Sequence, residues 1–377
     1  MREGVEFYEG VNALPHGRAS VCSPIHVQKR EEFACQGEAY FGRRVDSPMT
    51  SRKRNRQRAA LALCAALSFW AASAARAQTG WVSERHGPAG KDLNAVYFSD
   101  SKRGWVGGDN GLLLRTEDGG RTWARQQVGA KEGISDLYFR DKSDGYLLAG
   151  NQILVTEDGG ASWRMAARFL ASTFGGAEPD LYSVRFTSKR RGWVVGSLSR
   201  GDNVVDSLVL QTTDGGASWN LQRVPVTDEL IHLDFDGDKR GWVVGAEGRI
   251  LHTRDGGETW TLQESKTTAT LYHVEVRGEE RGWAVGERGT ILRTVDGGET
   301  WTVARAPVRT TLLSVKFVND EEGWAVGRGG IILRSGDGGQ TWVQQESRTR
   351  HHLYALFFDK KTGWAVGGDG LIFRYER

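Results

Sequence analysis

Six aspartates recur in one setting, T/S-x-D-G-G-x-T/S-W, and repeated carboxylates are the groups that metal binding or acid–base catalysis would use. A catalytic or metal site is needed once in a protein, whereas a residue needed in every repeat is more typical of a turn. The Asp side chain can accept hydrogen bonds from nearby backbone N–H groups, and the glycines permit the left-handed conformation that follows. We therefore predict structural turns at Asp118, Asp158, Asp214, Asp255, Asp296 and Asp337.

A second set of ionisable residues falls at equivalent positions of consecutive repeats. One position before the last apolar residue of a strand-like run stand Arg185, Asp234, Glu275 and Lys316, and two positions earlier in two of these runs stand His232 and His273. Because side chains two apart on a strand share a face, we expect all six to lie together near the centre of the fold. They would form either a site for a polar ligand or peptide, or charge pairs between neighbouring repeats.

This set of residues could in principle support two kinds of chemistry, metal binding or glycoside hydrolysis. Two histidines with two carboxylates can bind a metal, but their spacing matches no diagnostic ligand pattern, so we predict neither a metal nor a cofactor. Glycoside hydrolysis needs two carboxylates at a defined separation, which Asp234 and Glu275 could supply. Nothing else in the sequence supports hydrolysis, and we predict no catalytic residue.

The secondary-structure elements that position these residues can be predicted from a repeat of aromatic residues. A Gly-aromatic step recurs every 40 to 49 residues, at Trp105, Tyr146, Trp193, Trp242, Trp283, Trp324 and Trp364. The clearest repeat holds four short strand-like runs, at 271–276, 282–286, 290–294 and 300–304, rich in β-branched and aromatic residues and separated by turns. This period and pattern predict an all-β, seven-bladed β-propeller with four-stranded antiparallel blades.

The ring closure can also be predicted by counting. There are seven Gly-aromatic steps but six aspartate turns, and the last repeat ends after three strands. The missing Trp-led strand stands at the start of the repeat region, in residues 80–85 (GWVSER). We expect this N-terminal strand to pair into the C-terminal blade, which ties the two ends of the ring together.

Two insertions break the regular spacing, at residues 165–179 and as an expanded loop at residues 197–207. Both should project from the same face, near the third blade. Loops that interrupt a repeat often carry binding function, although neutral variation in a tolerant loop leaves the same pattern. Arg200 and Asp202, at the centre of the second insertion, are therefore added to the candidate binding residues.

The N-terminal region resembles a targeting segment rather than part of the fold. Residues 1–48 are expected to be a disordered leader or a mis-assigned start, and residues 49–77 read as a signal peptide with a basic start, an apolar stretch and an A-x-A site. The propeller would span 78–377 and be exported, to a periplasm or a thylakoid lumen. The apolar stretch is too short for a stable membrane span, so contact with a membrane would be peripheral.

The charge of the chain excludes one further class of protein, those that bind nucleic acid. The formal net charge of the full chain is +3, and the basic excess lies in residues 1–77, which leaves the propeller nearly balanced. We therefore predict no nucleic-acid partner.

The repeat unit GW-x-VG-x-x-G-x-ILRT-x-DGG-x-TW, at 282–301 and with small changes at 104–123, 241–260 and 323–342, resembles the photosystem II stability/assembly factor family. The resemblance covers residues 80–377. It implies a monomeric, non-enzymatic scaffold that holds a membrane protein subunit or assembly intermediate from the periplasmic or lumenal side. Blade 2 departs from the unit with DGYLLAGNQ. The aspartate turns also look like the Asp box of BNR propellers, which leaves a carbohydrate-binding or glycoside-hydrolase-like protein as the alternative.

Overall fold

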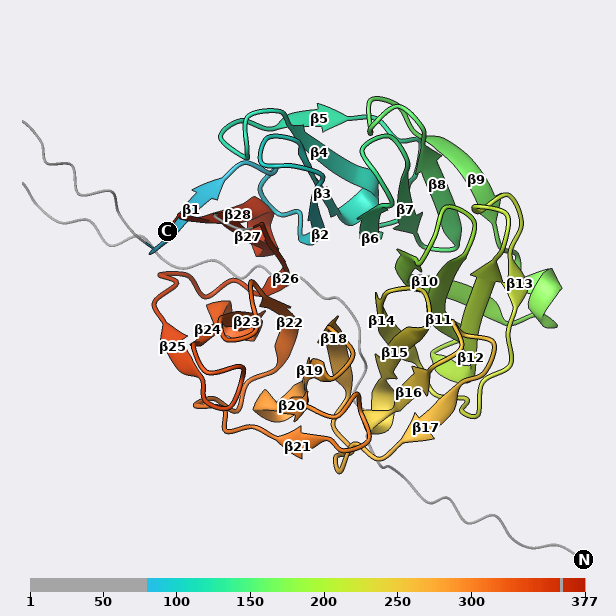
Figure 1. The fold of residues 1–377 in the computed structure, drawn as a ribbon. Coiled ribbons are helices and arrows are strands. Elements are labelled where there is room, and N and C mark those ends of the chain that lie inside the picture. Colours follow the sequence, from blue (N-terminus) through green and yellow to red (C-terminus); the bar gives the residue numbers. More distant parts are fainter. Residues whose placement is uncertain (1–79, 360–361, 377) are drawn as a thin grey trace, which may run out of the picture. The chain divides into compact units, whose positions relative to one another are not determined.

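A computed structural model describes residues 80–359 and 362–376, which form seven four-stranded antiparallel sheets arranged in a ring (Figure 1). This confirms the predicted seven-bladed β-propeller. The predicted leader (1–48) and signal peptide (49–77) lie outside the described residues. Within the described ranges, no helix is long and apolar enough to cross a membrane.

Each blade runs in chain order from the centre of the ring outward. Blades 1 to 3 contain β2 (Leu93–Phe98), β3 (Gly104–Gly108), β4 (Leu112–Thr116), β5 (Ala124–Gln126), β6 (Ile134–Phe139), β7 (Gly145–Ala149), β8 (Gln152–Thr156), β9 (Arg164–Arg168), β10 (Glu178–Phe186), β11 (Gly192–Arg200), β12 (Asn203–Thr212) and β13 (Asn220–Leu221). Blades 4 to 6 contain β14 (Leu230–Asp236), β15 (Arg240–Gly245), β16 (Ile250–Thr253), β17 (Thr261–Gln263), β18 (Leu271–Arg277), β19 (Arg281–Gly286), β20 (Ile291–Thr294), β21 (Thr302–Val303), β22 (Leu312–Phe317), β23 (Gly323–Gly327), β24 (Ile332–Ser335) and β25 (Val343–Gln345).

Blade 7 combines the two ends of the described chain, as predicted. Its strands are β26 (Leu353–Phe358), β27 (Thr362–Gly367), β28 (Leu371–Glu376) and β1 (Gly80–Arg85). β1 pairs antiparallel with β28, with Trp81 opposite Tyr375, and Figure 1 shows β1 beside the C-terminal strand. The Trp81 ring also packs edge-on against Trp324 of blade 6, with ring centroids 5.5 Å apart. The closing strand therefore joins two blades as well as two ends.

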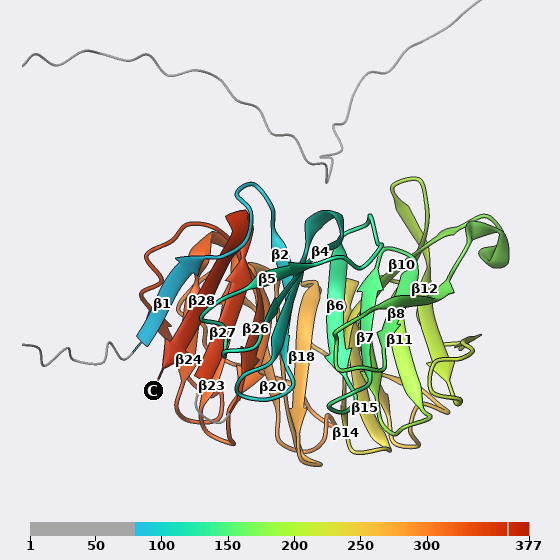
Figure 2. The ribbon, with the colours of Figure 1, turned by 90° about the horizontal axis from the view of Figure 1, so that it is seen from above.

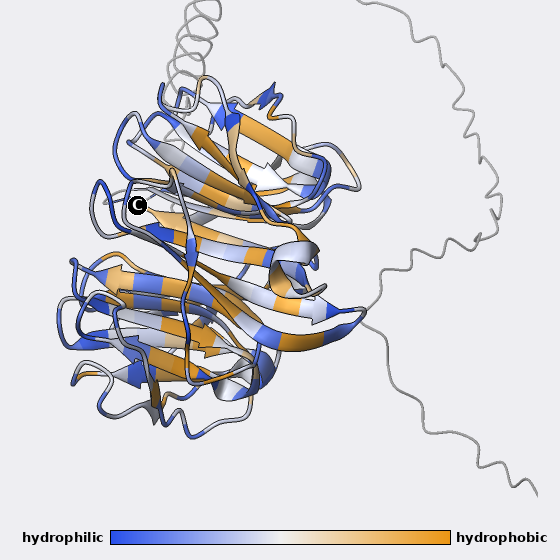
Figure 3. Ribbon diagram, turned by 90° about the vertical axis from the view of Figure 1, so that its right-hand side faces the viewer, coloured by the Kyte–Doolittle hydropathy of each residue, from blue (hydrophilic) through white to orange (hydrophobic). Residues whose placement is uncertain are grey.

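The two faces of the ring differ in their connections. One face carries the connections between successive blades and the turns between the second and third strands of each blade; we call it the loop face. The opposite face carries the aspartate turns, and we call it the Asp-turn face. In Figure 3 the turns at the ends of the strands are mostly hydrophilic, whereas apolar segments lie within the strands.

An aromatic joint connects successive blades. The Trp283 ring of blade 5 stacks on Phe317 of blade 6, with centroids 3.6 Å apart and planes at 12°, and Trp342 meets the same phenyl ring edge-on at 5.8 Å. Gly339, the second glycine of the blade 6 aspartate turn, lies against this stack. A Cβ atom on Gly339 would come within 2.4 Å of Trp283 Nε1, so the indole occupies the space that any side chain would need.

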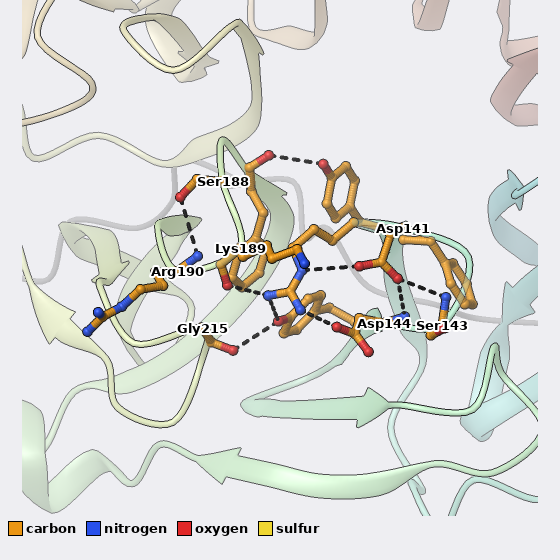
Figure 4. A network of polar contacts seen from close by, with 12 residues as sticks. Asp141, Ser143, Asp144, Ser188, Lys189, Arg190 and Gly215 are labelled. Atoms are coloured by element: carbon orange, nitrogen blue, oxygen red, sulfur yellow. Dashed lines mark hydrogen bonds and ion pairs between the residues drawn. The ribbon is translucent and has the colours of Figure 1, made fainter.

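Blade 2, the exception in the sequence, preserves this joint with a tyrosine. Tyr146 stacks on Phe186 of blade 3 at 4.0 Å, and its hydroxyl donates to the Gly215 carbonyl oxygen at 2.9 Å. Trp283 donates from Nε1 to the equivalent carbonyl, of Gly338, at the same distance. Figure 4 shows the Gly215 contact beside a network in which Arg140 bridges towards the next blade through the Lys189 carbonyl.

The aspartate turns share one hydrogen-bond pattern, which the blade 5 copy illustrates. Asp296 Oδ1 accepts from the Thr294 hydroxyl at 2.7 Å and from the Thr300 N–H at 2.9 Å, while Oδ2 accepts from the Thr300 hydroxyl at 2.5 Å. In blade 1 the backbone and hydroxyl hydrogen bonds from Thr122 lower the pKa of Asp118 to about 2. Both carboxylate oxygens are thus engaged within the turn.

The second insertion differs from the expected loop. Residues 197–207 extend β11 and β12 into a long hairpin, because the pairing continues to Arg200 opposite Asn203. The first insertion forms a short 3-10 helix, η2 (Ala171–Phe174), and Arg200 Nη2 donates to the Gly175 carbonyl oxygen just after it at 3.0 Å. The two insertions therefore brace one another, and Figure 2 shows them at the same end of the ring.

We predict that Gly160→Ala destabilises the ring by about 3 kcal/mol, because the new methyl group must displace the Trp105 ring, only 2.6 Å from its Cβ position. Gly278→Ala is the matched control, since it has a similar positive φ of +61° but nothing within 4 Å of the Cβ position. Backbone strain alone should cost this control about 1 kcal/mol. Denaturant unfolding measures both, and equal losses would show that the aromatic contact is not the constraint.

Trp81→Ala should lower the free energy of unfolding by about 3 kcal/mol, because it removes the ring that joins β1 to blades 6 and 7. Val82→Ala on the same strand, at a side chain 37% exposed, should cost about 0.5 kcal/mol or less. Thermal unfolding of the two variants gives the comparison. Similar unfolding temperatures would mean that the closing strand does not depend on its tryptophan.

Candidate functional site

The structure brings the six predicted inner residues together on four neighbouring inner strands. Arg185 lies on β10, His232 and Asp234 on β14, His273 and Glu275 on β18, and Lys316 on β22. A seventh residue, Asp136 on β6, joins them through an ion pair with Arg185. We call these seven residues the inner polar cluster.

At one end of the cluster, Arg185 links three blades. Its Nη1 lies 2.8 Å from Asp136 Oδ2 in blade 2, and its Nη2 lies 3.1 Å from His232 Nε2 in blade 4. Asp136 Oδ2 also accepts the Val184 N–H at 2.9 Å. Asp136 was not among the predicted site residues, although it occupies the inner-strand position at which His232 and His273 stand in their blades. Only the packing of adjacent strands shows that it faces Arg185.

At the other end, carboxylates bind the backbone of the next blade. Asp234 Oδ2 accepts the Val276 N–H at 3.0 Å, and Glu275 Oε2 accepts the Phe317 N–H at 2.8 Å while Oε1 pairs with Lys316 Nζ at 3.0 Å. Burial raises the pKa of both carboxyl groups, and the Lys316 ammonium partly offsets the shift. These acids therefore join blades.

The two histidines stack on each other between blades 4 and 5, with ring centroids 3.8 Å apart. Burial lowers the pKa of each imidazole well below 6.5, and the nearby Arg185 and Lys316 cations lower it further. The imidazoles are thus neutral near pH 7. Within the part of the chain that the structure describes, no group of three or more His, Cys, Asp or Glu side chains is arranged to hold a metal ion.

The geometry favours a structural role for most of the cluster. Glu275 is 2% exposed and His232 is 8% exposed, and the Asp234 and Glu275 carboxylates each hold a backbone N–H. Lys316 is the most open member, with a third of its side chain exposed. Arg200 and Asp202 belong to a separate place, the exposed tip of the β11–β12 hairpin, and no described hydrogen bond or ion pair connects them to the cluster.

A feature that the sequence did not reveal is a bulge near the start of every inner strand, on the loop face. Pairing with the second strand shifts by one residue in all seven blades. Such bulges redirect a side chain. In blades 3 to 7 the bulged residues are large and partly exposed, and we call them the bulge rim: Tyr182, Ile231, Tyr272, Leu313 and Tyr354.

Beside the bulge rim, four arginines emerge from separate connections of the loop face. Arg288 and Arg328 lie in the 3-10 turns η4 (Glu287–Gly289) and η5 (Arg328–Gly330), and Arg309 and Arg350 lie in the connections that precede β22 and β26. All four are exposed, and none forms an ion pair with a described carboxylate. We call them the arginine arc.

The Asp-turn face contrasts with this arrangement. Its arginines before the Gly-Trp steps pair with acids, either of the next blade, as in Arg281 with Asp320 at 2.8 Å and Arg240 with Glu279 at 3.1 Å, or of the same blade, as in Arg103 with Asp100. Repeated arginines on this face are thus neutralised. The arginine arc lies on the loop face instead, at positions that differ from blade to blade. Comparing those turn positions between repeats is the sequence signal that would have found it.

Fold and surface together define a seven-bladed propeller with closely joined blades and an arc of exposed arginines on its loop face. The chain belongs to the family described as "Photosynthesis system II assembly factor YCF48", whose sequence pattern matches residues 125–220, 175–264, 259–352 and 309–376. The matches run through most of the described ring, from the outer strand of blade 1 to the end of β28.

Two relatives match over shorter segments. The photosystem II assembly lipoprotein Ycf48 of Synechococcus sp. (strain CC9902) is 35% identical over 72 residues, 18% of this chain and 19% of its own. The chloroplastic photosystem II stability/assembly factor HCF136 of Oryza sativa subsp. japonica is 29% identical over 119 residues, 29% of this chain and 25% of its own. The matched segments thus span about a fifth and a quarter of these relatives.

Solved structures share the fold at low identity. YCF48 bound to a D1 peptide has a TM-score of 0.65 and 21% identity, covering 79% of this chain and 95% of that one. YCF48 from Cyanidioschyzon merolae has a TM-score of 0.62 and 21% identity, covering 79% and 98%. A virginiamycin B lyase from Staphylococcus aureus has a TM-score of 0.64 at 13% identity, covering 79% and 99%. The fold by itself therefore does not separate binding proteins from enzymes.

Arg185→Leu should lower the free energy of unfolding by about 3 kcal/mol, because it leaves the Asp136 carboxylate buried without its cation. In that background Asp136→Asn should cost much less than in the unchanged protein. Urea unfolding of both single variants and the double variant gives the coupling energy. Arg200→Leu, at the exposed hairpin tip, is the control. Strictly additive losses would contradict the pairing.

Proposed function

We propose that this propeller is a non-enzymatic scaffold that binds a segment of a membrane protein subunit or assembly intermediate and assists its assembly. Membership of the assembly-factor family supports this role, and the similar YCF48 structure holds a D1 peptide. The observation that carries the proposal is the arginine arc, four exposed guanidinium groups without an ion pair among the described residues, beside a rim of partly exposed tyrosine and aliphatic side chains.

Physical chemistry indicates what such a surface binds. Guanidinium groups bind carboxylates in a planar, two-pronged geometry, so unpaired arginines select acidic groups. Tyr272, Leu313 and Tyr354 lie on the same blades as the arc and offer apolar contact area with little rotational entropy to lose. The ligand class is therefore an extended acidic peptide segment that also carries apolar side chains.

Rigid strands hold this surface in place. Each arginine stands in a short connection between β-strands, so the four charges are positioned before a ligand arrives, which reduces the entropy lost on binding. The hairpin tip with Arg200 and Asp202 is proposed as a secondary contact on the loop face, and Lys316 of the inner polar cluster as a secondary contact inside the ring. We propose that the mature protein acts as a monomer, without a cofactor.

The cellular location and the identity of the client protein are part of the same proposal. The predicted signal peptide supports export to a periplasm or thylakoid lumen, where the propeller would meet its client at the membrane surface without spanning it. The client would be a photosystem II subunit where the host contains that complex. Hydrolysis is not proposed, because the two carboxylates it would need, Asp234 and Glu275, are each bound to the backbone of the next blade.

The test compares matched charge reversals on the two faces. Arg309→Glu with Arg328→Glu should weaken binding of a D1 peptide by about tenfold or more, because two unpaired cations become anions. Arg240→Glu with Arg281→Glu changes the net charge equally on the Asp-turn face and should alter binding by less than about twofold. Fluorescence anisotropy at two salt concentrations measures affinity, and binding should weaken as salt rises.

Capture from detergent-solubilised membranes extends the test to the natural client. The unchanged protein should retain a membrane protein that the loop-face variant loses and the Asp-turn-face variant keeps. Equal peptide affinity in both variants would overturn the assignment of the face. Release of sugar from a glycan panel, with no membrane protein retained, would overturn the scaffold function itself.

A further inference from the structure

One joint of the ring lacks the aromatic stack that connects the others. In six joints, an aromatic ring of one blade stacks on a phenylalanine of the next blade's inner strand. Between blades 4 and 5 the phenylalanine position is held by Val276, and Trp242 stacks instead on His252 of its own blade at 4.4 Å. This joint therefore depends more on its other contacts.

Polar groups supply those contacts. The His232 and His273 rings stack across the joint at 3.8 Å, His232 Nδ1 faces the Val274 N–H at 3.4 Å, and Asp234 accepts the Val276 N–H at 3.0 Å. The two valine amides thus point from blade 5 to side chains of blade 4. Where other joints use a phenyl ring, this one adds a pair of imidazoles, which can gain a proton.

The surroundings of His232 tolerate only the neutral ring. One ring nitrogen faces a backbone N–H and the other faces Arg185 Nη2, and both of these groups can only donate. The neutral imidazole accepts from one of these donors and turns its own N–H towards the other, whereas a protonated imidazole is a donor at both nitrogens and accepts from neither. It would also stack a cation against His273.

The two cations around the pair act in the same direction, whereas burial raises the pKa of Asp234 and Glu275, so protonation of these two carboxyl groups favours the closed joint. Ionisable side chains reach the pair from five inner strands: Asp136 and Tyr138 (β6), Arg185 (β10), Asp234 (β14), Glu275 (β18) and Lys316 (β22). The Arg185 and Lys316 cations oppose an imidazolium. The acids are already engaged, Asp136 with Arg185, Glu275 with Lys316 and Asp234 with the backbone.

We propose that the joint between blades 4 and 5 is an acid-sensitive opening point of the ring, where protonation of the His232–His273 pair separates β14 from β18. The direction of the pH effect follows from the linkage between proton binding and opening of the joint. The folded joint lowers both imidazole pKa values below 6.5, so the opened joint binds more protons as the pH falls below that value. The joint is therefore most stable above about pH 6.5 and weakens progressively below it.

Amide hydrogen exchange at single-residue resolution tests this in the intact ring. Between about pH 7.5 and pH 5.0, the protection factors of the Val274 and Val276 amides should fall by about tenfold or more. The Leu356 amide donates to the Ser314 hydroxyl at 3.2 Å across the joint between blades 6 and 7, and this hydroxyl acceptor does not titrate in that pH range. Its protection should stay constant within about twofold over the same range.

Three variants test whether the histidine pair causes the loss of amide protection at low pH. His232→Gln with His273→Phe removes both titrating rings and should abolish the pH dependence at Val274 and Val276. Val276→Phe should restore the missing stack on Trp242, since Gly282 keeps the space that glycine leaves for a phenyl ring in other blades, and should reduce the acid-induced loss. His351→Asn, at an exposed imidazole in blade 7, should leave it unchanged.

The outcomes decide between opening and general unfolding. Loss of protection at Leu356 together with the two valine amides would show that acid unfolds the whole ring, and the proposal fails. It also fails if the unchanged protein keeps its Val274 and Val276 protection at pH 5.0, or if His351→Asn removes the effect. Should the double histidine variant not fold, the unchanged protein and Val276→Phe still give a decisive comparison.

Discussion

The contact between a tryptophan of one blade and the second glycine of the next aspartate turn constrains the rest of the ring. At Gly339 the indole of Trp283 occupies the space of a side chain, and Phe317 completes the stack. This contact recurs at six of the seven joints, with Tyr146 as the aromatic residue in one of them, and Trp81 packs on Trp324 at the joint between blades 6 and 7. Glycine, aromatic ring and turn must therefore recur together, which explains why the repeat is so strict.

Function is left to positions that the joint does not constrain. The residues that repeat are used within turns or between blades, as Asp296 is by its turn and Trp283 by its stack on Phe317. The loop face varies, because its turns between strands can change residue without disturbing the packing below. The arginine arc and the β11–β12 hairpin both lie there. Repetition thus marks what holds the ring, and the contacts proposed for a partner lie at the positions that vary.

The inner polar cluster lies between these two categories. Its positions repeat, yet its residues differ from blade to blade, and they pair sideways, as Arg185 does with Asp136 and Lys316 with Glu275. The sequence placed both members of the second pair near the centre and favoured pairing between neighbouring blades over a ligand site. It missed Asp136 altogether, because pairing across a joint depends on how adjacent inner strands are staggered, which no single repeat records.

The sequence by itself determined the blade count, the strand order and the closure by residues 80–85, because these follow from counting a period that local turn chemistry enforces. Only the tertiary structure decided that residues 197–207 form a hairpin instead of a loop, that Tyr182 and its equivalents sit on bulges, and that Arg288 and Arg328 face solvent unpaired. The physical reason is the distance along the sequence between the residues that determine each property. Turns and periods are local properties, whereas pairing, burial and charge balance depend on residues about one blade, roughly 40 positions, away.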